Sequence, residues 1–383
     1  MDGRHPALIR AKSAIVHDWF QGFHGSERVV EAMRTGLFAP GNPPDVFTFH
    51  AARELLPAEL AASIVRESRL AGLPGIRQRG HHPGRWRYLL PYMPSFFRRL
   101  PLDEYELVVS SSHACAVNVR PRTDALHLCY CYTPMRYAWM PAVERGRARG
   151  LRGAALSRTA KRLARIDLEA SRRPDAYVAI SSAVQERIQR FYGRDATVIH
   201  PPVDVEDFDP SAEKEPGHFL WVHRLVEYKR PELVAEAFRD LPYRLTMVGV
   251  GPLEVRLRRM LPANVELLGW LPRHELARLY ERASGFVHVG EEDFGISMVE
   301  ALAAGTPVLA LDRGGARDIV REGNDGILLP EAEIDALRAA VRELAERSWD
   351  PLALAQRARA FSGETFCANL LAFIDASFPG RVG

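Results

Sequence analysis

Two glutamates in the last third of the chain are spaced in a way that suits recognition of a hydroxyl-rich ligand. Glu292 and Glu300 are separated by seven residues, within the segment GFVHVGEEDFGISMVEALAAGTPVLA. Carboxylate oxygens accept hydrogen bonds from sugar or ribose hydroxyls. Glu292 falls in an expected loop and Glu300 in the helix after it, so both side chains can face one ligand. Taken alone, the three acids at 291–293 are more typical of an ordinary solvated loop.

A pair of cations stands at a second expected turn. Arg224 and Lys229 follow the apolar run HFLWV and precede the helical pattern PELVAEAF. Two cations beside the amides of a strand-to-helix turn suit a diphosphate, because each can donate charge-assisted hydrogen bonds to phosphate oxygens. The alternative for an isolated pair is two ordinary surface cations.

The elements around the acids indicate a β-α-β unit. We predict strands at 285–289 and 308–311, joined by a helix over 296–304 whose apolar residues recur at helical spacing. Gly305 and Pro307 end this helix. The acidic loop then lies at the carboxyl end of a strand, which is where open α/β sheets bind ligands. Gly249, Gly251 and Gly269 end two further expected strands at the same edge.

The first half of the chain has a similar alternation. A strand over 13–19 leads into the loop QGFHGSE, which contains Gly25, and a helix follows. Such a loop is only weak evidence for a phosphate site. His113 comes just after an expected strand at 105–110, and Tyr132 and Arg136 follow another at 127–131. A lone histidine is more often structural, so the residues alone leave the role of His113 open.

Composition limits the classes of protein to which the chain can belong. It has 383 residues, 47% hydrophobic and 26% charged, with a formal net charge of +3. These values indicate a globular protein of two to three domains and do not favour nucleic-acid binding. No apolar run reaches the ~20 residues of a membrane span. We expect a cytoplasmic protein without a signal peptide, and reduced, mostly buried thiols rather than a metal site at the four cysteines.

Two segments are strongly basic. Residues 75–101 interleave arginines with aromatic residues, and residues 145–173 have ten bases against two acids. Three interpretations of the first remain open: an acceptor-side lobe, a patch that contacts a membrane surface at the inner face of the membrane, or a solvated segment whose aromatics are core. The second segment is typical of a solvated helix face, or of a contact with anionic lipid.

Three motifs together resemble the retaining, nucleotide-sugar-dependent glycosyltransferases of family 4. They are the E-x7-E of Glu292 and Glu300, the R-L-x-x-x-K of Arg224 and Lys229, and CYTPMRYAW at 131–139. The resemblance implies the α/β GT-B fold, with two Rossmann-like domains facing a cleft. It places an acceptor-side domain at 1–203, joined by a last helix in 361–383 that crosses back to it, and a donor domain at 204–360. The third motif is typical of a mannosyltransferase-like subgroup.

The resemblance also implies roles for individual residues. It gives catalysis to His113, Glu292, Arg224 and Lys229, and the acceptor side to Tyr132 and Arg136. It gives donor binding to Gly25, Gly249, Gly251, Gly269, Asp293, Phe294, Gly295, Ile296, Ser297 and Glu300. The chain departs from the family pattern at Tyr132, where a histidine is usual, and at His24 and His223, where glycine is usual.

The implied reaction needs no cofactor and no metal. The resemblance implies that a sugar, expected to be mannose from GDP-mannose, moves to a hydroxyl of a glycan or lipid-linked acceptor, with retained anomeric configuration. Asp207-Phe208-Asp209 matches the D-x-D of metal-dependent glycosyltransferases, but it lies in the expected linker and we interpret it as a coincidence. Two alternatives stay open: a sugar-nucleotide epimerase of the same fold, and a non-catalytic module that binds anionic ligands or lipid surfaces. The full set of cations and carboxylates argues against the module.

Overall fold

The chain divides into two compact units. The computed structural model describes residues 8–74, 76, 85–140 and 150–380. Unit 1 comprises Met1–Pro202 with Phe366–Gly383, and unit 2 comprises Val203–Thr365. The sequence predicts these boundaries at 203 and 361. Parts of the two basic segments, 77–84 and 145–149, lie outside the described residues.

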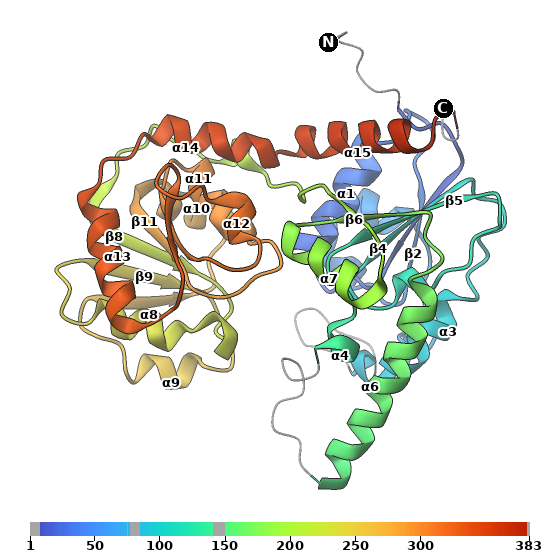
Figure 1. The fold of residues 1–383 in the computed structure, drawn as a ribbon, viewed down its shortest axis with the longest axis horizontal. Helices are drawn as coiled ribbons and strands as arrows, with labels where there is room; N and C mark the ends of the chain where they lie inside the picture. The colour runs from blue at the N-terminus through green and yellow to red at the C-terminus, as the bar shows by residue number, and fades with distance from the viewer. Residues whose placement is uncertain (1–7, 75, 77–84, 141–149, 381–383) are drawn as a thin grey trace. The chain divides into compact units, whose positions relative to one another are not determined.

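Unit 1 is built on a parallel sheet with helices along its connections (Figure 1). Its strand order is β3-β2-β1-β4-β5-β6-β7. The strands are β1 (Ser13–His17), β2 (Asp45–Thr48), β3 (Ile64–Arg66), β4 (Leu107–Ser112), β5 (Leu126–Cys131), β6 (Ala176–Ala179) and β7 (Thr197–Val198). Every residue of β1, β4 and β5 is buried, as expected for parallel strands covered on both faces.

The helices of unit 1 follow the predicted alternation. The α-helices are α1 (Gly25–Gly36), α2 (Ala58–Ser63), α3 (Met93–Phe97), α4 (Arg136–Trp139), α6 (Gly150–Ala170), α7 (Ser182–Tyr192) and α15 (Gly363–Ser377). Short 3-10 turns are η1 (Arg53–Leu55), η2 (Trp86–Tyr92) and η3 (Ala116–Asn118). Ser181 caps α7 by accepting a hydrogen bond from the amide of Val184 at 3.2 Å, a role that serine favours.

The last helix, α15, completes unit 1. The ring of Phe366 packs edge-on against Tyr130 of β5, with centroids 5.7 Å apart. The thiol of Cys367 donates to the carbonyl of Ala32 in α1 at 3.5 Å. The expected return of the last helix to the first domain is therefore confirmed. Cys115, Cys129 and Cys131 are free and buried, and Cys367 is free and half-buried.

Unit 2 has a six-stranded parallel sheet, in the order β10-β9-β8-β11-β12-β13. The strands are β8 (Glu215–Val222), β9 (Arg244–Val248), β10 (Val265–Gly269), β11 (Ala283–His288), β12 (Val308–Leu311) and β13 (Gly326–Leu329). The helices are α8 (Pro231–Phe238), α9 (Glu254–Arg258), α10 (Arg273–Arg282), α11 (Ile296–Ala303), α12 (Ala316–Ile319), α13 (Ile334–Glu346) and α14 (Pro351–Ala358). The turns η4 (Val205–Asp207), η5 (Glu227–Lys229) and η6 (Arg359–Phe361) join them.

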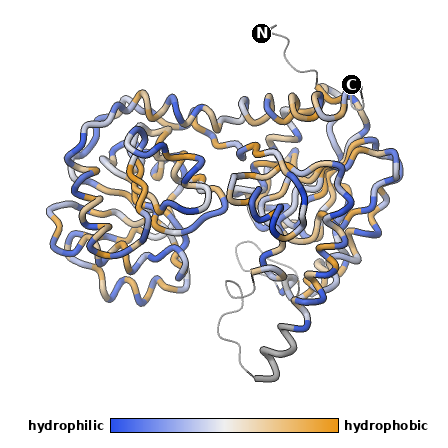
Figure 2. The backbone as a smooth tube through the Cα atoms, in the orientation of Figure 1, coloured by the Kyte–Doolittle hydropathy of each residue, from blue (hydrophilic) through white to orange (hydrophobic). Residues whose placement is uncertain are grey.

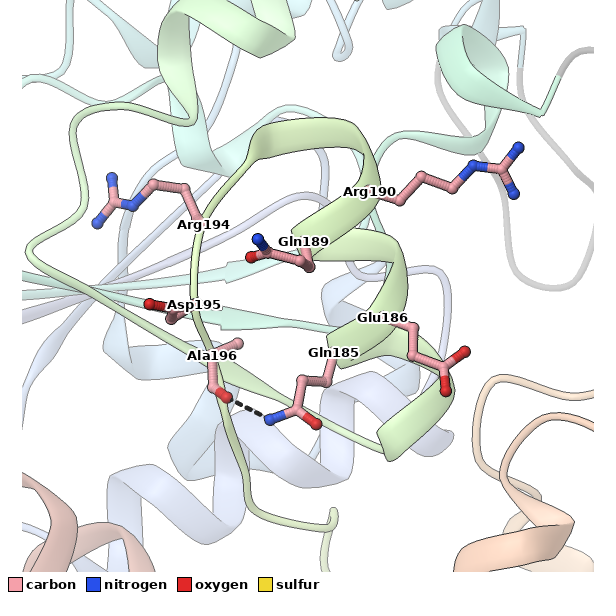
Figure 3. Close-up of a pocket in the computed structure, with 7 residues that line it drawn as sticks. All are labelled: Gln185, Glu186, Gln189, Arg190, Arg194, Asp195 and Ala196. Carbon is pink, nitrogen blue, oxygen red and sulfur yellow. Dashed lines mark hydrogen bonds between the residues drawn. The ribbon is translucent and has the colours of Figure 1, made fainter.

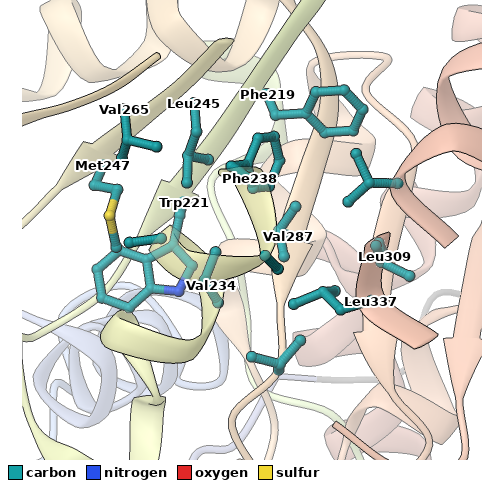
Figure 4. Packing of buried hydrophobic residues seen from close by; sticks show 14 of the residues in the cluster. Phe219, Trp221, Val234, Phe238, Leu245, Met247, Val265, Val287, Leu309 and Leu337 are labelled. Carbon is teal, nitrogen blue, oxygen red and sulfur yellow. The ribbon is translucent and has the colours of Figure 1, made fainter. Parts of the chain in front are cut away.

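Apolar side chains hold each unit together. In unit 2, Phe219 and Trp221 of β8 pack with Phe238 of α8 and Leu337 of α13 in one buried cluster (Figure 4). Hydrophobic residues are concentrated along the strands of both sheets, and the helices alternate between hydrophobic and hydrophilic residues (Figure 2). Burying one such side chain stabilises the fold by about 1.5–3 kcal/mol. Among the described residues, no helix is both long enough and apolar enough to span a bilayer.

Candidate active site

The loops that hold the predicted cations and the first glutamate follow two neighbouring strands at one edge of the unit 2 sheet. The strands β8 and β11 are neighbours, and the chain leaves them toward opposite sides of the sheet, to β9 and to β12. In open α/β sheets this switch point is where ligands bind. The loop after β8 holds Arg224 and Lys229, and the loop after β11 holds Glu292.

Lys229 and Glu292 form an ion pair, Nζ to Oε1. Lys229 is buried and Glu292 is half-buried. A buried ammonium group is tolerated when a carboxylate neutralises it, so each residue holds the other in place. Arg224, in contrast, is exposed, and no ion pair joins it to any residue that the structure describes. The site therefore combines one fixed cation and one cation that is open to a ligand.

Two glycines fix the loop that contains Glu292. The amide of Gly315 donates to the carbonyl of Glu292 at 3.0 Å. A Cβ atom at Gly314 would collide with that same carbonyl, and one at Gly315 would collide with the carbonyl of Phe294. Gly314 also has a φ of +62°, which glycine adopts at little cost. Only glycine lets these two backbones approach so closely.

Glu300 has a partner that the sequence analysis did not foresee. The guanidinium of Arg273 donates to Oε1 of Glu300 at 2.9 Å and to Oδ2 of Asp207 at 2.7 Å. Glu300 is therefore linked to Asp207 of the D-x-D segment through one arginine. Asp209 accepts hydrogen bonds from the amide and hydroxyl of Ser211, at 2.9 and 2.6 Å. Both acids of the D-x-D have protein partners.

The glycines at the ends of β9 and β10 serve backbone packing. A Cβ atom at Gly249 would collide with the carbonyl of His223, and one at Gly251 with the carbonyl of Leu225. The amide of Gly249 donates to the carbonyl of Gly269 at 2.7 Å. These contacts within unit 2 account for the glycines at 249 and 251 without a ligand. Gly269 has a φ of +80° and precedes Trp270, which is exposed.

The other residues predicted to bind the donor surround the start of α11. Gly295 precedes the helix with a φ of +110°, and Phe294 is buried with its ring 5.7 Å from that of Phe361. Asp293, Ile296 and Ser297 are half-buried at the same turn. This turn presents the first amides of α11 next to the Glu292 loop.

Two buried histidines are close enough to Lys229 to be affected by its charge. The rings of His223 and His288 are 4.5 Å apart between centroids. Burial lowers the pKa of His288 to about 3, with a further contribution from the charge of Lys229. Burial also lowers the pKa of His223, and His288 and Lys229 add to this. Both imidazoles are therefore neutral at physiological pH. In the sequence, His223 stands out only as a departure from the family pattern, and His288 carries no signal of its own.

In unit 1, a buried carboxylate organises the edge formed by β1 and β4. Asp18 follows β1 and is fully buried. Its two oxygens accept hydrogen bonds from four consecutive amides, those of His113, Ala114, Cys115 and Ala116, at 2.5 to 2.9 Å. The turn after β4 is thus wrapped around one carboxylate. Nothing in the local sequence marks Asp18 as such a residue, because its partners lie about ninety-five positions away along the chain.

His113 lies at the rim of this turn. Its Nδ1 is 3.5 Å from Oδ2 of Asp18, and its side chain is 23% exposed. The ring stands edge-on to Trp19, with centroids 4.4 Å apart. The imidazole is held from two sides yet remains accessible, which suits a group that acts on a bound ligand.

Tyr132 links β4 to the start of α1 through hydrogen bonds of its buried hydroxyl. Its side chain is buried, and its hydroxyl pairs with Oγ of Ser111 at 2.9 Å and donates to the carbonyl of Ser26 at 3.1 Å. Burial raises the pKa of the phenol above its ordinary value. Gly25 is the first residue of α1, so this helix starts earlier than predicted and shortens the glycine loop. Arg136 is half-buried at the first position of α4.

A surface hollow of about 480 Å³ lies elsewhere on unit 1. Gln185, Gln189 and Arg190 of α7 line it, together with the segment 194–196 (Figure 3). The amide of Gln185 donates to the carbonyl of Ala196 at 2.6 Å across it. No residue predicted for the site lines this hollow. Among the described residues, no group of three or more His, Cys, Asp or Glu is placed to hold a metal ion.

Comparison with known proteins relates both halves of the chain to glycosyltransferases. The family model described as "Glycosyltransferase Family 4" matches residues 23–207, and the one described as "Glycosyl transferases group 1" matches residues 203–361. A GDP-mannose-dependent alpha-mannosyltransferase of Mycobacterium tuberculosis is 34% identical over 187 residues, 45% of this chain and 49% of the relative. Its counterpart from Mycolicibacterium smegmatis is 35% identical over 192 residues, 47% and 51%. The matched region thus spans about half of each relative.

Solved structures share the fold over almost the whole chain. HepE from Anabaena, crystallised with UDP, has a TM-score of 0.67 at 16% identity and matches 95% of this chain and 100% of its own. Sucrose-phosphate synthase from Thermosynechococcus elongatus has a TM-score of 0.67 at 17% identity, over 96% and 99%. Such likeness establishes the architecture of two parallel-sheet units. With one family model on each half and this architecture, the chain belongs to the glycosyltransferases of family 4, which have the GT-B fold.

Proposed function

We propose that the protein transfers a sugar from a nucleoside diphosphate to an acceptor hydroxyl with retention of configuration. The observation that carries this proposal is the ion pair of Lys229 and Glu292 at the β8–β11 switch point, with the exposed Arg224 in the same loop as Lys229. Two cations there can take the diphosphate, and a carboxylate next to them can take hydroxyls of the sugar.

The chemistry follows from the leaving group. As the bond between the sugar and the β-phosphate breaks, negative charge grows on the phosphate oxygens. Lys229 is held in place by Glu292 and Arg224 is exposed, so both can stabilise that charge, which is usually the largest single term in catalysis. The departing phosphate would take the proton of the acceptor hydroxyl on the same face of the sugar. Glu292 would hold the sugar, and the oxygen of Glu300 that Arg273 does not bind would accept from the ribose.

GDP-mannose is the proposed donor. The support is the identity of about one third to two relatives whose names state GDP-mannose dependence. The structure of HepE was solved with UDP, but at 16% sequence identity its likeness to this chain is evidence for the fold alone. The proposed acceptor is a hydroxyl of a growing glycan or a lipid-linked saccharide.

The donor can be tested by thermal unfolding of the protein with a panel of nucleotides. We expect GDP and GDP-mannose at a hundred times their Kd to stabilise the protein by about 2.7 kcal/mol. UDP, ADP and their sugars should have little effect at the same concentration, and guanosine without phosphate is the control for base binding alone. Stabilisation by UDP but not GDP would overturn the donor. A protein that no nucleoside diphosphate stabilises would not be a nucleotide-sugar enzyme.

We also expect activity to be independent of divalent metal. Both acids of the D-x-D already have protein partners: Arg273 pairs with Asp207, and the amide of Ser211 donates a hydrogen bond to Asp209. Arg224 and Lys229 can neutralise the diphosphate in place of a metal ion. Turnover of GDP-mannose should therefore be unchanged in excess EDTA. The matched variant Asp209→Asn should keep full activity. The prediction would be contradicted if activity strictly required manganese or magnesium and Asp209→Asn abolished that metal-dependent activity.

A further inference from the structure

A surface of unit 1 combines exposed apolar side chains with arginines. It is formed by β3, the turn that follows it, the end of η2 and the residues just after α3. Its members, which we call the Arg66 patch, are Val65, Arg66, Arg69, Leu70, Tyr92 and Arg99, and all six are exposed. The turn after β3 lies at the carboxyl end of the unit 1 sheet, and none of the six residues is among those predicted for the site.

Two adjacent hollows show that the patch is continuous. The first, about 290 Å³, is lined by Arg66, Leu70, Tyr92 and Arg99 among others. The second, about 590 Å³, is lined by Val65, Arg66 and Arg69, with Glu67 and Phe96. Arg66 lines both hollows, so the apolar and basic members of the patch share one surface.

The charge of this region has one sign. Residues 64–100 include eight arginines and a single acid, Glu67. Glu67 pairs with Arg53, Nε to Oε1 at 3.2 Å, so it does not neutralise the patch. Among the described residues, no ion pair joins Arg66, Arg69 or Arg99 to an acid. The patch is therefore complementary to a surface with many negative charges.

The exposed apolar side chains of the patch favour a partner that has an apolar phase as well as negative charges. Tyr92 is 63% exposed, Val65 53% and Leu70 47%. Tyr88, on the same η2 turn, is 80% exposed. Tyrosine has an apolar ring and a polar tip, and such residues favour the interface between a bilayer and water. Exposed apolar groups gathered in one place mark an interaction site more often than isolated ones do.

We propose that the Arg66 patch docks unit 1 on the surface of an anionic phospholipid bilayer. The arginines contact lipid phosphates, and Tyr92, Leu70 and Val65 enter the headgroup layer. The contact is peripheral, made by side chains of a folded surface. Of the three interpretations of the basic aromatic segment 75–101, this proposal favours contact with a membrane surface. The contact is made by described residues within that segment and next to it.

The full chain should be tested by co-sedimentation with vesicles at low salt. We expect binding to vesicles of phosphatidylcholine with about a third phosphatidylglycerol, and little binding to phosphatidylcholine alone. Binding should fall steeply as salt rises, because the Debye length shrinks from about 10 Å at 0.1 M to about 3 Å at 1 M. Indifference to vesicle charge at low salt would overturn the proposal.

Two variants separate the charges from the apolar groups. The triple change Arg66→Gln, Arg69→Gln and Arg99→Gln should weaken binding at least tenfold, since one cation near an anionic surface contributes about fivefold. Its matched control is Arg259→Gln, Arg278→Gln and Arg342→Gln, three exposed arginines of unit 2 for which no ion pair joins a described residue. Leu70→Ser with Tyr92→Ser should also weaken binding, with Val255→Ser and Leu352→Ser, 66% and 64% exposed, as its control.

The outcomes discriminate among partners. If the unit 2 controls weaken binding as much as the patch variants, the contact is not at the patch. If Tyr92→Ser and Leu70→Ser leave binding unchanged while dextran sulfate binds as tightly as vesicles, the partner is a soluble polyanion and the proposal fails. Each variant is first checked for an unchanged melting temperature, and Tyr92→Ser alone, at an exposed site, serves if a multiple variant does not fold.

Discussion

Replacing Lys229 by methionine should lower kcat by about tenfold to a hundredfold, because a charge-assisted hydrogen bond contributes about 1.5–3 kcal/mol. The leaving phosphate carries more charge in the transition state than in the ground state, so the loss should appear in kcat and in the affinity for nucleoside diphosphate alike. Methionine keeps most of the apolar stem and deletes the charge. Turnover of GDP-mannose and binding of GDP are the two measurements.

The ion pair with Glu292 separates catalysis from stability. Lys229→Met leaves a half-buried carboxylate without its partner, which should also lower the free energy of unfolding. Glu292→Gln in the same chain removes the unpaired charge, so the double variant should regain stability but not turnover. Recovery of turnover along with stability would mean that Lys229 acts only by holding the loop.

Arg224→Met is the matched variant for the exposed cation. Arg224 makes no ion pair with a described residue, so its loss should leave the melting temperature unchanged while kcat falls. If Arg224→Met and Lys229→Met both fold and both keep the kcat of the parent, the diphosphate does not bind at the β8–β11 switch point.

Replacing Asp18 by asparagine should destabilise unit 1 by about 3 kcal/mol or more, because each hydrogen bond to a charged group contributes about 1.5–3 kcal/mol. Asparagine has the same shape but one acceptor oxygen, so it cannot satisfy the four amides at 113–116. At about 2–4 °C for each kcal/mol in a domain of this size, the melting temperature of unit 1 should fall by about 6–12 °C. Calorimetry on the full chain measures the change.

Asp103→Asn is the control for Asp18→Asn. Asp103 is an exposed residue of the same unit, and surface substitutions usually change stability by no more than about 0.5 kcal/mol. Turnover should fall in Asp18→Asn even below its melting temperature, since the backbone that positions His113 is bound to this carboxylate. Equal melting temperatures for the two variants would show that Asp18 does not hold the turn.

The fold and the loops after β8 and β11 were accessible to sequence reasoning because their signals are local. The alternation of apolar strands with helical patterns indicates β-α-β units, and the resemblance to family 4 implies two Rossmann-like domains. The two parallel sheets of the structure confirm this fold class. Arg224, Lys229 and Glu292 were predicted to lie at strand ends, and the adjacency of β8 and β11 brings them together. Parallel strands put all their carboxyl ends at one edge, which is why position along a strand predicted proximity.

The pairings that were missed join residues far apart in the chain. Arg273 binds Glu300 across twenty-seven positions and Asp207 across sixty-six, and nothing in the local pattern selects those partners. The resemblance to family 4 implies donor binding at Gly249 and Gly251, and that role stays a prediction. The structure accounts for them by the close approach of His223 and Leu225, a contact that depends on the spacing of β8 and β9.

The division of the chain has a consequence for the order in which it is synthesised. Unit 2 is one continuous stretch, whereas unit 1 includes Phe366 and the residues after it. A ribosome that has released residues 1–202 has therefore delivered the whole sheet of unit 1 without the helix whose Phe366 packs on Tyr130. Domains generally fold as they emerge, N-terminal first, at about 5–20 residues per second. Here all elements of unit 2 are synthesised before unit 1 is complete. For some ten to thirty seconds, the surface of β5 and α1 that α15 contacts therefore stays uncovered.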